Sequence, residues 1–197
     1  MTLDLVINAL IFFCTALCFV LTFRKEGVWS WKNGAEALHY FTILSNLFCA
    51  CACLAVVFCL RSGTLPRSVW IFKYIGTTAV TVTLLTVLFF LGPSLGYKTL
   101  LSGTSFYYHL VGPLLAVVSF CFLERFYDLS FPLSLLGIAP VLLYGLVYLY
   151  KVVLCPEDRR WEDFYGYNKS GKWPISFAAM LIGAFLICAL LRLFYRL

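Results

Sequence analysis

The sequence predicts an all-α integral membrane protein, in which one transmembrane domain over residues 1–197 forms a bundle of six membrane-spanning helices. The first observation is composition: 62% of the residues are hydrophobic, 12% are charged, and the mean hydropathy is +0.93. A soluble domain of this length needs more charge to cover its surface. The second is that apolar residues gather in blocks of about 20, long enough to cross about 30 Å of hydrocarbon as helices. The third is that the sequence lacks the alternating pattern of a membrane β-barrel, which leaves helices to satisfy the backbone in lipid.

The first apolar block, Leu3–Phe23, is expected to be a retained span and not a cleaved signal peptide. Asp4 is its only early charge, no small-residue cleavage site follows it, and Arg24 and Lys25 come next. Five further blocks of similar length are expected to be the other spans. They are Leu38–Leu60, Val69–Leu91, Phe106–Leu123, Pro132–Leu154 and Pro174–Tyr195.

The connections between the blocks differ on the two sides of the membrane. Six spans place residues 1 and 197 on one side, which we call side A, and the more elaborate connections on the other, side B. The first side-B connection carries Trp29 and Trp31, which suit the lipid headgroup level. The fifth connection, residues 155–173, mixes charges with aromatic residues and is expected to be an ordered lid. Cations are spread over both sides, so the orientation stays open.

The cysteines and the net charge exclude several functions. The nine cysteines form no CxxC pair, and Cys49 and Cys53 share a helix face that Cys51 does not, which is poor geometry for a metal. We therefore expect cysteines that pack, with no metal and no cofactor. The charge of +6 is spread over the connections, which indicates membrane anchoring and no nucleic-acid partner.

Charged residues are absent from the middle of every apolar block. Asp4, Lys73 and Lys151 lie near block ends, so we expect an interior without ionisable groups. Ion channels and proton-coupled transporters place such groups at depth, so this pattern disfavours both classes.

Polar residues of the second and fourth blocks are the candidate site. Even-numbered spans all start from side B, so Thr42 and His109 are expected about one turn into the membrane, at the same level as Ser176. Pro113 cannot donate to the carbonyl of His109, so we expect a bend that frees this carbonyl. One face of the second block carries a polar stripe at spacings of three and four: His39, Thr42, Asn46, Cys49 and Cys53.

A hydroxyl and an imidazole at one level suit acyl transfer. The imidazole takes the hydroxyl proton, the oxygen attacks an ester carbonyl, and a donor such as Asn46 stabilises the oxyanion. His39 and Ser176 are further candidates for contact with substrate. A third group normally orients the imidazole, and Asp163 or Glu162 from the fifth connection is a candidate. The alternative is structural, because threonines in membrane helices often bond their own backbone and a histidine at a span end is often interfacial.

Three stretches resemble a known family. "YFTILSNLF" opens the second span, "YHLVGPLLAVVSF" lies at the start of the fourth, and "DFYGYNKSGKWPIS" ends the fifth connection. They resemble the bacterial six-span membrane proteins related to the androgen-induced-gene and androgen-dependent TFPI-regulating proteins. The animal relatives are threonine hydrolases of fatty acid esters of hydroxy fatty acids. The resemblance implies Thr42 as nucleophile, His109 as base, and a place in the bacterial cell membrane.

Two functional hypotheses follow. The first is a lipid-ester hydrolase of the membrane, with a membrane lipid or lipid ester as its partner. The second is a non-enzymatic protein that binds or transports a lipid or small apolar molecule in the same pocket. A fold with a collapsed interior near His109 favours a scaffold subunit instead.

Overall fold

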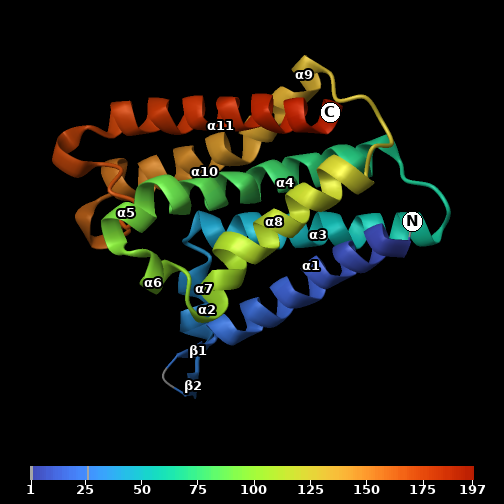
Figure 1. The fold of residues 1–197 in the computed structure, drawn as a ribbon. Helices are drawn as coiled ribbons and strands as arrows, with labels where there is room; N and C mark the ends of the chain where they lie inside the picture. Colours follow the sequence, from blue (N-terminus) through green and yellow to red (C-terminus); the bar gives the residue numbers. More distant parts are fainter. Residues whose placement is uncertain (1, 26) are drawn as a thin grey trace.

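The computed structural model describes residues 2–25 and 27–197, and in these residues six helices are long and apolar enough to cross a membrane (Figure 1). The prediction of an all-α six-span bundle is confirmed, and each span ends within a few residues of its expected bounds. The first, second and sixth spans are single helices. These are α1 (Thr2–Thr22), α3 (Phe41–Arg61) and α11 (Trp173–Arg196).

The other three spans contain wide π-helical turns. The third span is α4 (Arg67–Thr86), η1 (Val87–Leu91) and α5 (Gly92–Leu95). The fourth is α7 (Gly103–Phe106), η2 (Tyr107–Val111), α8 (Gly112–Val118) and η3 (Ser119–Leu123). The fifth is α9 (Phe131–Ser134), η4 (Leu135–Ile138), α10 (Ala139–Leu149) and η5 (Tyr150–Leu154).

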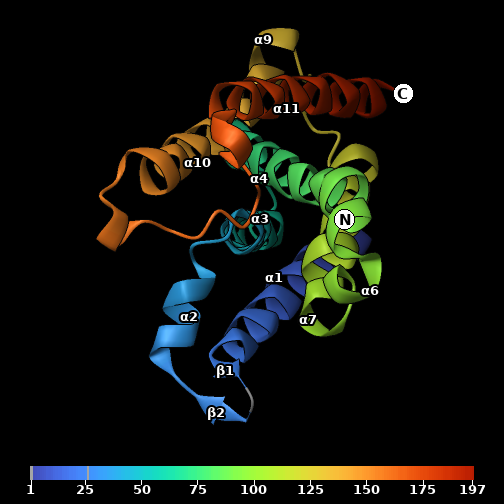
Figure 2. The same ribbon diagram turned by 90° about the vertical axis from the view of Figure 1, so that its left-hand side faces the viewer.

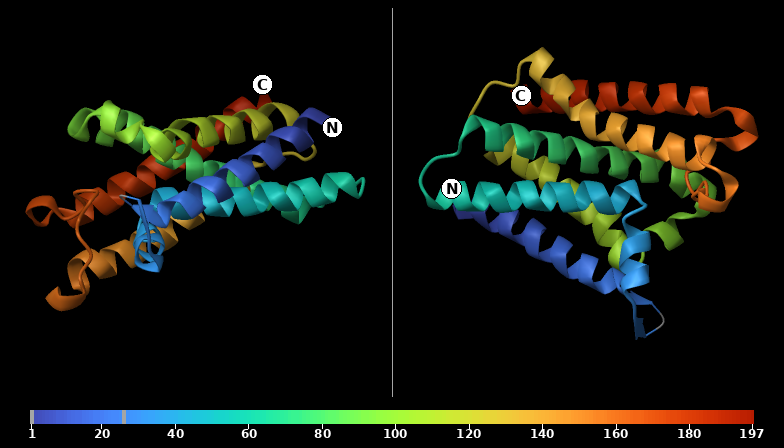
Figure 3. Two further views of the ribbon diagram at one scale, coloured as in Figure 1. Left: turned by 90° about the horizontal axis from the view of Figure 1, so that it is seen from below. Right: turned by 180° about the vertical axis from the view of Figure 1, so that it is seen from behind.

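The side-B connections are folded. The first forms a small hairpin and a short helix, which lie beyond the side-B ends of α1 and α3 (Figure 3, right). The third contains one helical turn, and the fifth contains two 3₁₀ turns. The elements are β1 (Arg24–Lys25), β2 (Val28–Trp29), α2 (Trp31–Ala37), α6 (Tyr97–Leu100), η6 (Glu157–Arg159) and η7 (Lys169–Gly171).

The third span is the centre of the bundle. Figure 2 shows α4 between α3 on one side and α10 and α11 on the other, and it also contacts α8. Its side-A half carries Trp70 and Tyr74, both fully buried against Phe120 of the fourth span. A Cβ at Gly76 would lie 2.9 Å from the Cα of Cys49, so this glycine lets α3 and α4 pack closely.

The second span starts later than expected. Tyr40 has an extended backbone (φ −94°, ψ 130°), so α3 begins at Phe41 and the residues before it form a turn. His39 therefore lies in a connection and does not open the span. The polar stripe at helical spacing consequently begins at Thr42.

The expectation of an interior without ionisable groups is wrong. Lys73 and Glu124 are fully buried, and Asp4 is 2% exposed. Each is near a span end in the sequence, but the side-A ends of α1, α4 and the fourth span meet one another. Position within a block did not reveal this meeting, because it depends on how the spans pack.

Candidate active site

A single amide joins the turn that carries Thr42 to the turn that carries His109. The Nδ2 atom of Asn46 donates to the carbonyl of Thr42 at 2.8 Å and to the carbonyl of Tyr108 at 3.1 Å. Both carbonyl oxygens thus lie within 3.1 Å of one nitrogen atom, and Tyr108 directly precedes His109 in the chain. The structure therefore places Thr42 and His109 on neighbouring turns of α3 and the fourth span.

Pro113 explains why the Tyr108 carbonyl needs a donor from another helix. In the π-helical turn η2, the N–H of Gly112 bonds to the carbonyl of Tyr107, five residues earlier. The same spacing would pair the Tyr108 carbonyl with residue 113, which is proline and has no N–H. Asn46 supplies the missing hydrogen. The freed carbonyl is thus that of Tyr108 and not that of His109, because the π turn shifts the pairing by one residue.

The imidazole of His109 is oriented by the backbone. Its Nδ1 atom lies 2.6 Å from the carbonyl oxygen of Leu100, at the end of α6. A carbonyl only accepts, so Nδ1 carries the hydrogen and Nε2 keeps its lone pair. His109 is half-buried, and its Nε2 is the atom available as a base.

The fifth connection does not supply the orienting group. Asp163 Oδ1 accepts from the Tyr148 hydroxyl and from the Tyr167 N–H, and Oδ2 accepts from the Asn168 N–H. These bonds order the connection itself. Glu162 is exposed. The carbonyl of Leu100 orients the His109 imidazole, a role that the sequence suggested for Asp163 or Glu162.

A phenol lies at the start of α3, next to Thr42. The Tyr165 hydroxyl accepts the Phe41 N–H at 3.1 Å, one residue before Thr42. Burial raises the pKa of Tyr165 above its usual value and outweighs the hydrogen bonds that favour the ionised form. The phenol therefore keeps its proton. In the described part of the chain no hydrogen bond joins Thr42 to His109.

Asn46 is built into the packing between the spans. Its amide carries two hydrogens, and both are used on the carbonyls of Thr42 and Tyr108. A Cβ at Gly112 would lie 3.2 Å from its Oδ1, so the glycine makes room for this side chain. The structure makes Asn46 a positioning residue, while the Tyr165 hydroxyl, which accepts the Phe41 N–H, lies next to Thr42.

His39 and Ser176 lie elsewhere on side B. The His39 ring stacks on Trp161 of the fifth connection with centroids 4.2 Å apart, and its carbonyl accepts from the Tyr144 hydroxyl at 2.8 Å. It joins the start of α3 to the lid. The Ser176 hydroxyl donates to the carbonyl of Lys172, the residue just before α11.

A groove of about 560 Å³ runs beside Thr42 between α3, α4 and α10. Its walls are almost entirely apolar, and Trp161 of the fifth connection lies at its side-B end. Ser45 is part of this lining, and its hydroxyl bonds to that of the buried Thr83 at 2.9 Å. Neither Thr42 nor His109 lines the groove. Its lining residues are Phe41, Leu44, Ser45, Phe48, Ile75, Ala79, Ala139, Pro140, Leu143, Tyr144, Val147 and Trp161.

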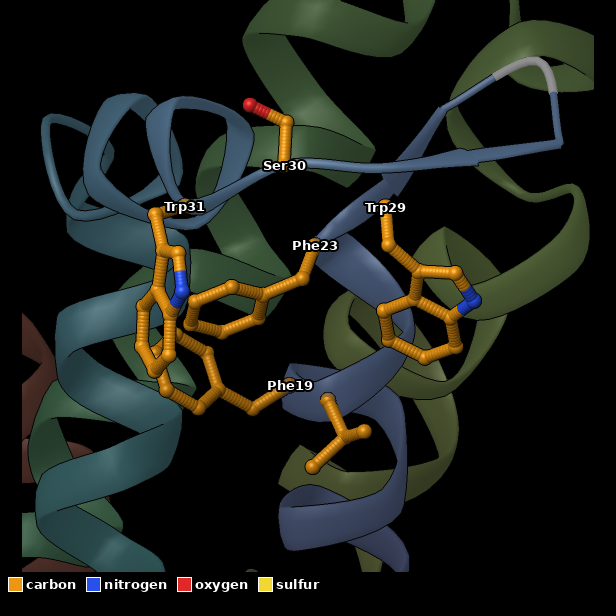
Figure 4. A pocket seen from close by; sticks show the side chains of 6 residues that line it. Phe19, Phe23, Trp29, Ser30 and Trp31 are labelled. Carbon is orange, nitrogen blue, oxygen red and sulfur yellow. The ribbon is translucent and has the colours of Figure 1, made fainter.

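A second hollow of about 460 Å³ lies where the hairpin meets the end of α1. Figure 4 shows Phe19 and Phe23 between Trp31 on one side and Trp29 on the other, with Ser30 above. The Phe23 and Trp31 rings meet edge to face. Trp29 and Trp31 are strongly exposed, as a headgroup-level position requires.

The cysteines fit a packing role. Cys49 and Cys53 are buried on one face of α3, while Cys51 is exposed, and the thiols are free. Among residues 2–25 and 27–197, no three His, Cys, Asp or Glu side chains are arranged to hold a metal ion.

Two groups of the site were not predicted from the sequence. The Leu100 carbonyl is a backbone atom, and no residue type marks it. Tyr165 lies in an aromatic-rich connection, but only the folded loop shows that it covers the start of α3.

Comparison of the chain with protein-family models, curated proteins and solved structures finds no match.

Proposed function

We propose that the protein is an integral membrane hydrolase of lipid esters, with Thr42 as nucleophile and His109 as general base. The observation that carries the proposal is the Asn46 bridge, which holds the turns of these two residues together. The contact of His109 Nδ1 with the Leu100 carbonyl supports it, because that contact leaves Nε2 free to accept a proton.

The proposed reaction is a double displacement. Nε2 of His109 takes the Thr42 proton as Oγ1 attacks the ester carbonyl carbon, and the Tyr165 hydroxyl donates to the oxyanion. The imidazolium then protonates the departing alcohol, which leaves an acyl-threonine. Water, deprotonated by His109, attacks this ester, and the acid leaves as Thr42 regains its proton. The Thr42 hydroxyl first turns towards His109.

An activity-based probe tests the assignment directly. Purified protein in lipid nanodiscs is treated with a fluorophosphonate, which reacts with activated hydroxyls. Thr42→Ala should abolish labelling and Thr42→Ser should keep part of it, while His109→Asn should slow it about 10²–10⁴-fold. Thr86→Ala is the matched control, because Thr86 is also a half-buried threonine near a side-B span end. Equal labelling of Thr42→Ala and the parent protein would refute the nucleophile.

The groove favours a second candidate, a protein that binds a lipid chain without turnover. Its apolar walls between α3, α4 and α10 suit an acyl chain, and Ser45 in its lining offers a polar contact. This candidate expects a stoichiometric lipid in native mass spectra and no product from a panel of lipid esters. Release of acid that depends on Thr42 distinguishes the hydrolase from it.

A further inference from the structure

A polar cluster lies buried at the side-A end of the bundle, far along the spans from Thr42. Its members come from α1, α4, the fourth span and the residue that follows it. All are 2% exposed or less, which is exceptional for charged side chains in a protein of this composition. The members are Asp4, Asn8, Lys73, Ser119 and Glu124.

Lys73 and Glu124 form the ion pair of this cluster. The Lys73 Nζ lies 3.2 Å from Glu124 Oε1 and donates to Asn8 Oδ1 at 2.6 Å. Ser119 donates to the same carboxyl oxygen of Glu124. A buried ammonium with these partners is compensated by one negative charge.

The cluster holds a second carboxyl beside the first. Nδ2 of Asn8 lies 2.8 Å from Asp4 Oδ1 and 2.9 Å from Glu124 Oε1, so the two carboxyls are neighbours. The same nitrogen also lies 3.0 Å from the Asp4 carbonyl and 3.2 Å from Ser119 Oγ. An amide has two hydrogens for these four oxygens. Asp4 Oδ2 and Glu124 Oε2 are buried with no partner.

Charge balance then requires a proton. With both carboxyls ionised, the buried cluster would hold two negative charges against one positive charge. An uncompensated buried charge costs several kcal/mol, and adjacent carboxylates cannot both ionise at low cost. Among the residues that the structure describes, the other titratable groups facing the cluster are thiols of α3: Cys53, whose Sγ is 3.1 Å from Lys73 Nζ, and Cys49 one turn away.

We propose that Asp4 and Glu124 form a proton-binding site, which holds one proton between the two carboxyls at neutral pH. The proton makes the cluster neutral as a whole and supplies the hydrogen that the Asn8 amide lacks. The site is separate from Thr42 and His109 and takes no part in the proposed hydrolysis.

Infrared spectroscopy of the purified full chain in nanodiscs tests the site. A protonated carboxyl has a C=O stretch separate from that of carboxylates, and it shifts in D₂O. The parent protein should show this band at neutral pH. Asp4→Asn and Glu124→Gln should each lose the whole band, because the remaining carboxylate then balances Lys73. Lys73→Met should double the band, because both carboxyls must then be neutral.

Controls separate the site from other acids and from the thiols. Asp163→Asn, on side B, and Cys53→Ser should leave the band unchanged. The parent spectrum alone keeps the test decisive if a variant fails to fold, which size-exclusion elution reports. A parent protein without the band at neutral pH would overturn the proposal. So would a band that persists in both Asp4→Asn and Glu124→Gln.

Discussion

Asn46 donates a hydrogen bond to the carbonyl of Tyr108, which the π-helical turn and Pro113 leave without a backbone donor. The same nitrogen holds the carbonyl of Thr42. One side chain thus supplies a donor to a carbonyl that the fourth span leaves unpaired, and it holds two spans together. This double use makes it the first target for mutation.

We expect Asn46→Ala to reduce stability by about 1–3 kcal/mol, because the Tyr108 carbonyl becomes a buried acceptor without a donor. Labelling of Thr42 should fall about 100-fold, because the two turns are no longer held in register. Thermal unfolding and probe labelling rates measure the two effects.

The double variant Asn46→Ala with Pro113→Ala separates stability from positioning. Residue 113 then has an N–H that can reach Tyr108, so part of the stability should return while labelling stays low. If stability and labelling both recover in the double variant, Asn46 affects labelling only by stabilising the fold.

Tyr165→Phe should lower the turnover of ester substrates about 10²–10³-fold, the cost of removing one oxyanion donor. The KM should change little, since the aromatic ring still covers α3. Tyr97→Phe is the control, because its phenol bonds the Leu88 carbonyl elsewhere on side B. Unchanged turnover in Tyr165→Phe would leave this phenol a purely structural neighbour of Thr42.

Ala139→Trp should fill the groove from α10 and shorten the chain it accepts. Each CH₂ kept out of the groove loses about 0.8 kcal/mol, so exclusion of two raises KM about tenfold. Esters with short chains should be unaffected. Leu146→Trp is the control on the same helix, because Leu146 is exposed and does not line the groove. The same KM rise in both variants would place the chain elsewhere.

The fifth connection should loosen at alkaline pH. Burial raises the pKa of Tyr167 to about 12, against about 10 in an unfolded chain. The folded form therefore binds this proton more tightly, and its contribution to stability is complete below about pH 10 and is lost as pH rises towards 12. Limited proteolysis of residues 155–172 across this range measures the opening.

Tyr167→Phe should reduce the alkaline opening of the fifth connection by the part that depends on ionisation of this phenol. Its hydroxyl is buried with no partner, so the variant should also be no less stable than the parent near neutral pH. A proteolysis profile identical to that of the parent would assign the alkaline transition to another group.

The sequence predicted the spans well. Block length and hydropathy are set by the membrane, so the ends of α1, α11 and the fifth span could be read from apolar runs. Thr42 and His109 were placed at one level because even-numbered spans start on one side. Both arguments need only the thickness of the bilayer and the direction of each span.

What escaped prediction depends on contacts between distant segments. The Leu100 carbonyl reaches His109 only through the folded third connection, and Tyr165 reaches Thr42 only through the folded fifth. The π turn moved the freed carbonyl from His109 to Tyr108, a shift of one residue that hydropathy cannot register. Asp4 and Glu124 lie next to each other because the side-A ends of the first and fourth spans converge.

The cluster around Asn8 also sets an order for biosynthesis. The first span leaves the ribosome with Asp4 and Asn8, but Lys73 and Ser119, which surround them, are translated later. Until the fourth span enters the bilayer, α1 has no complete set of polar partners there. Its final docking is therefore a late event of membrane insertion, although it is made before the spans that surround it.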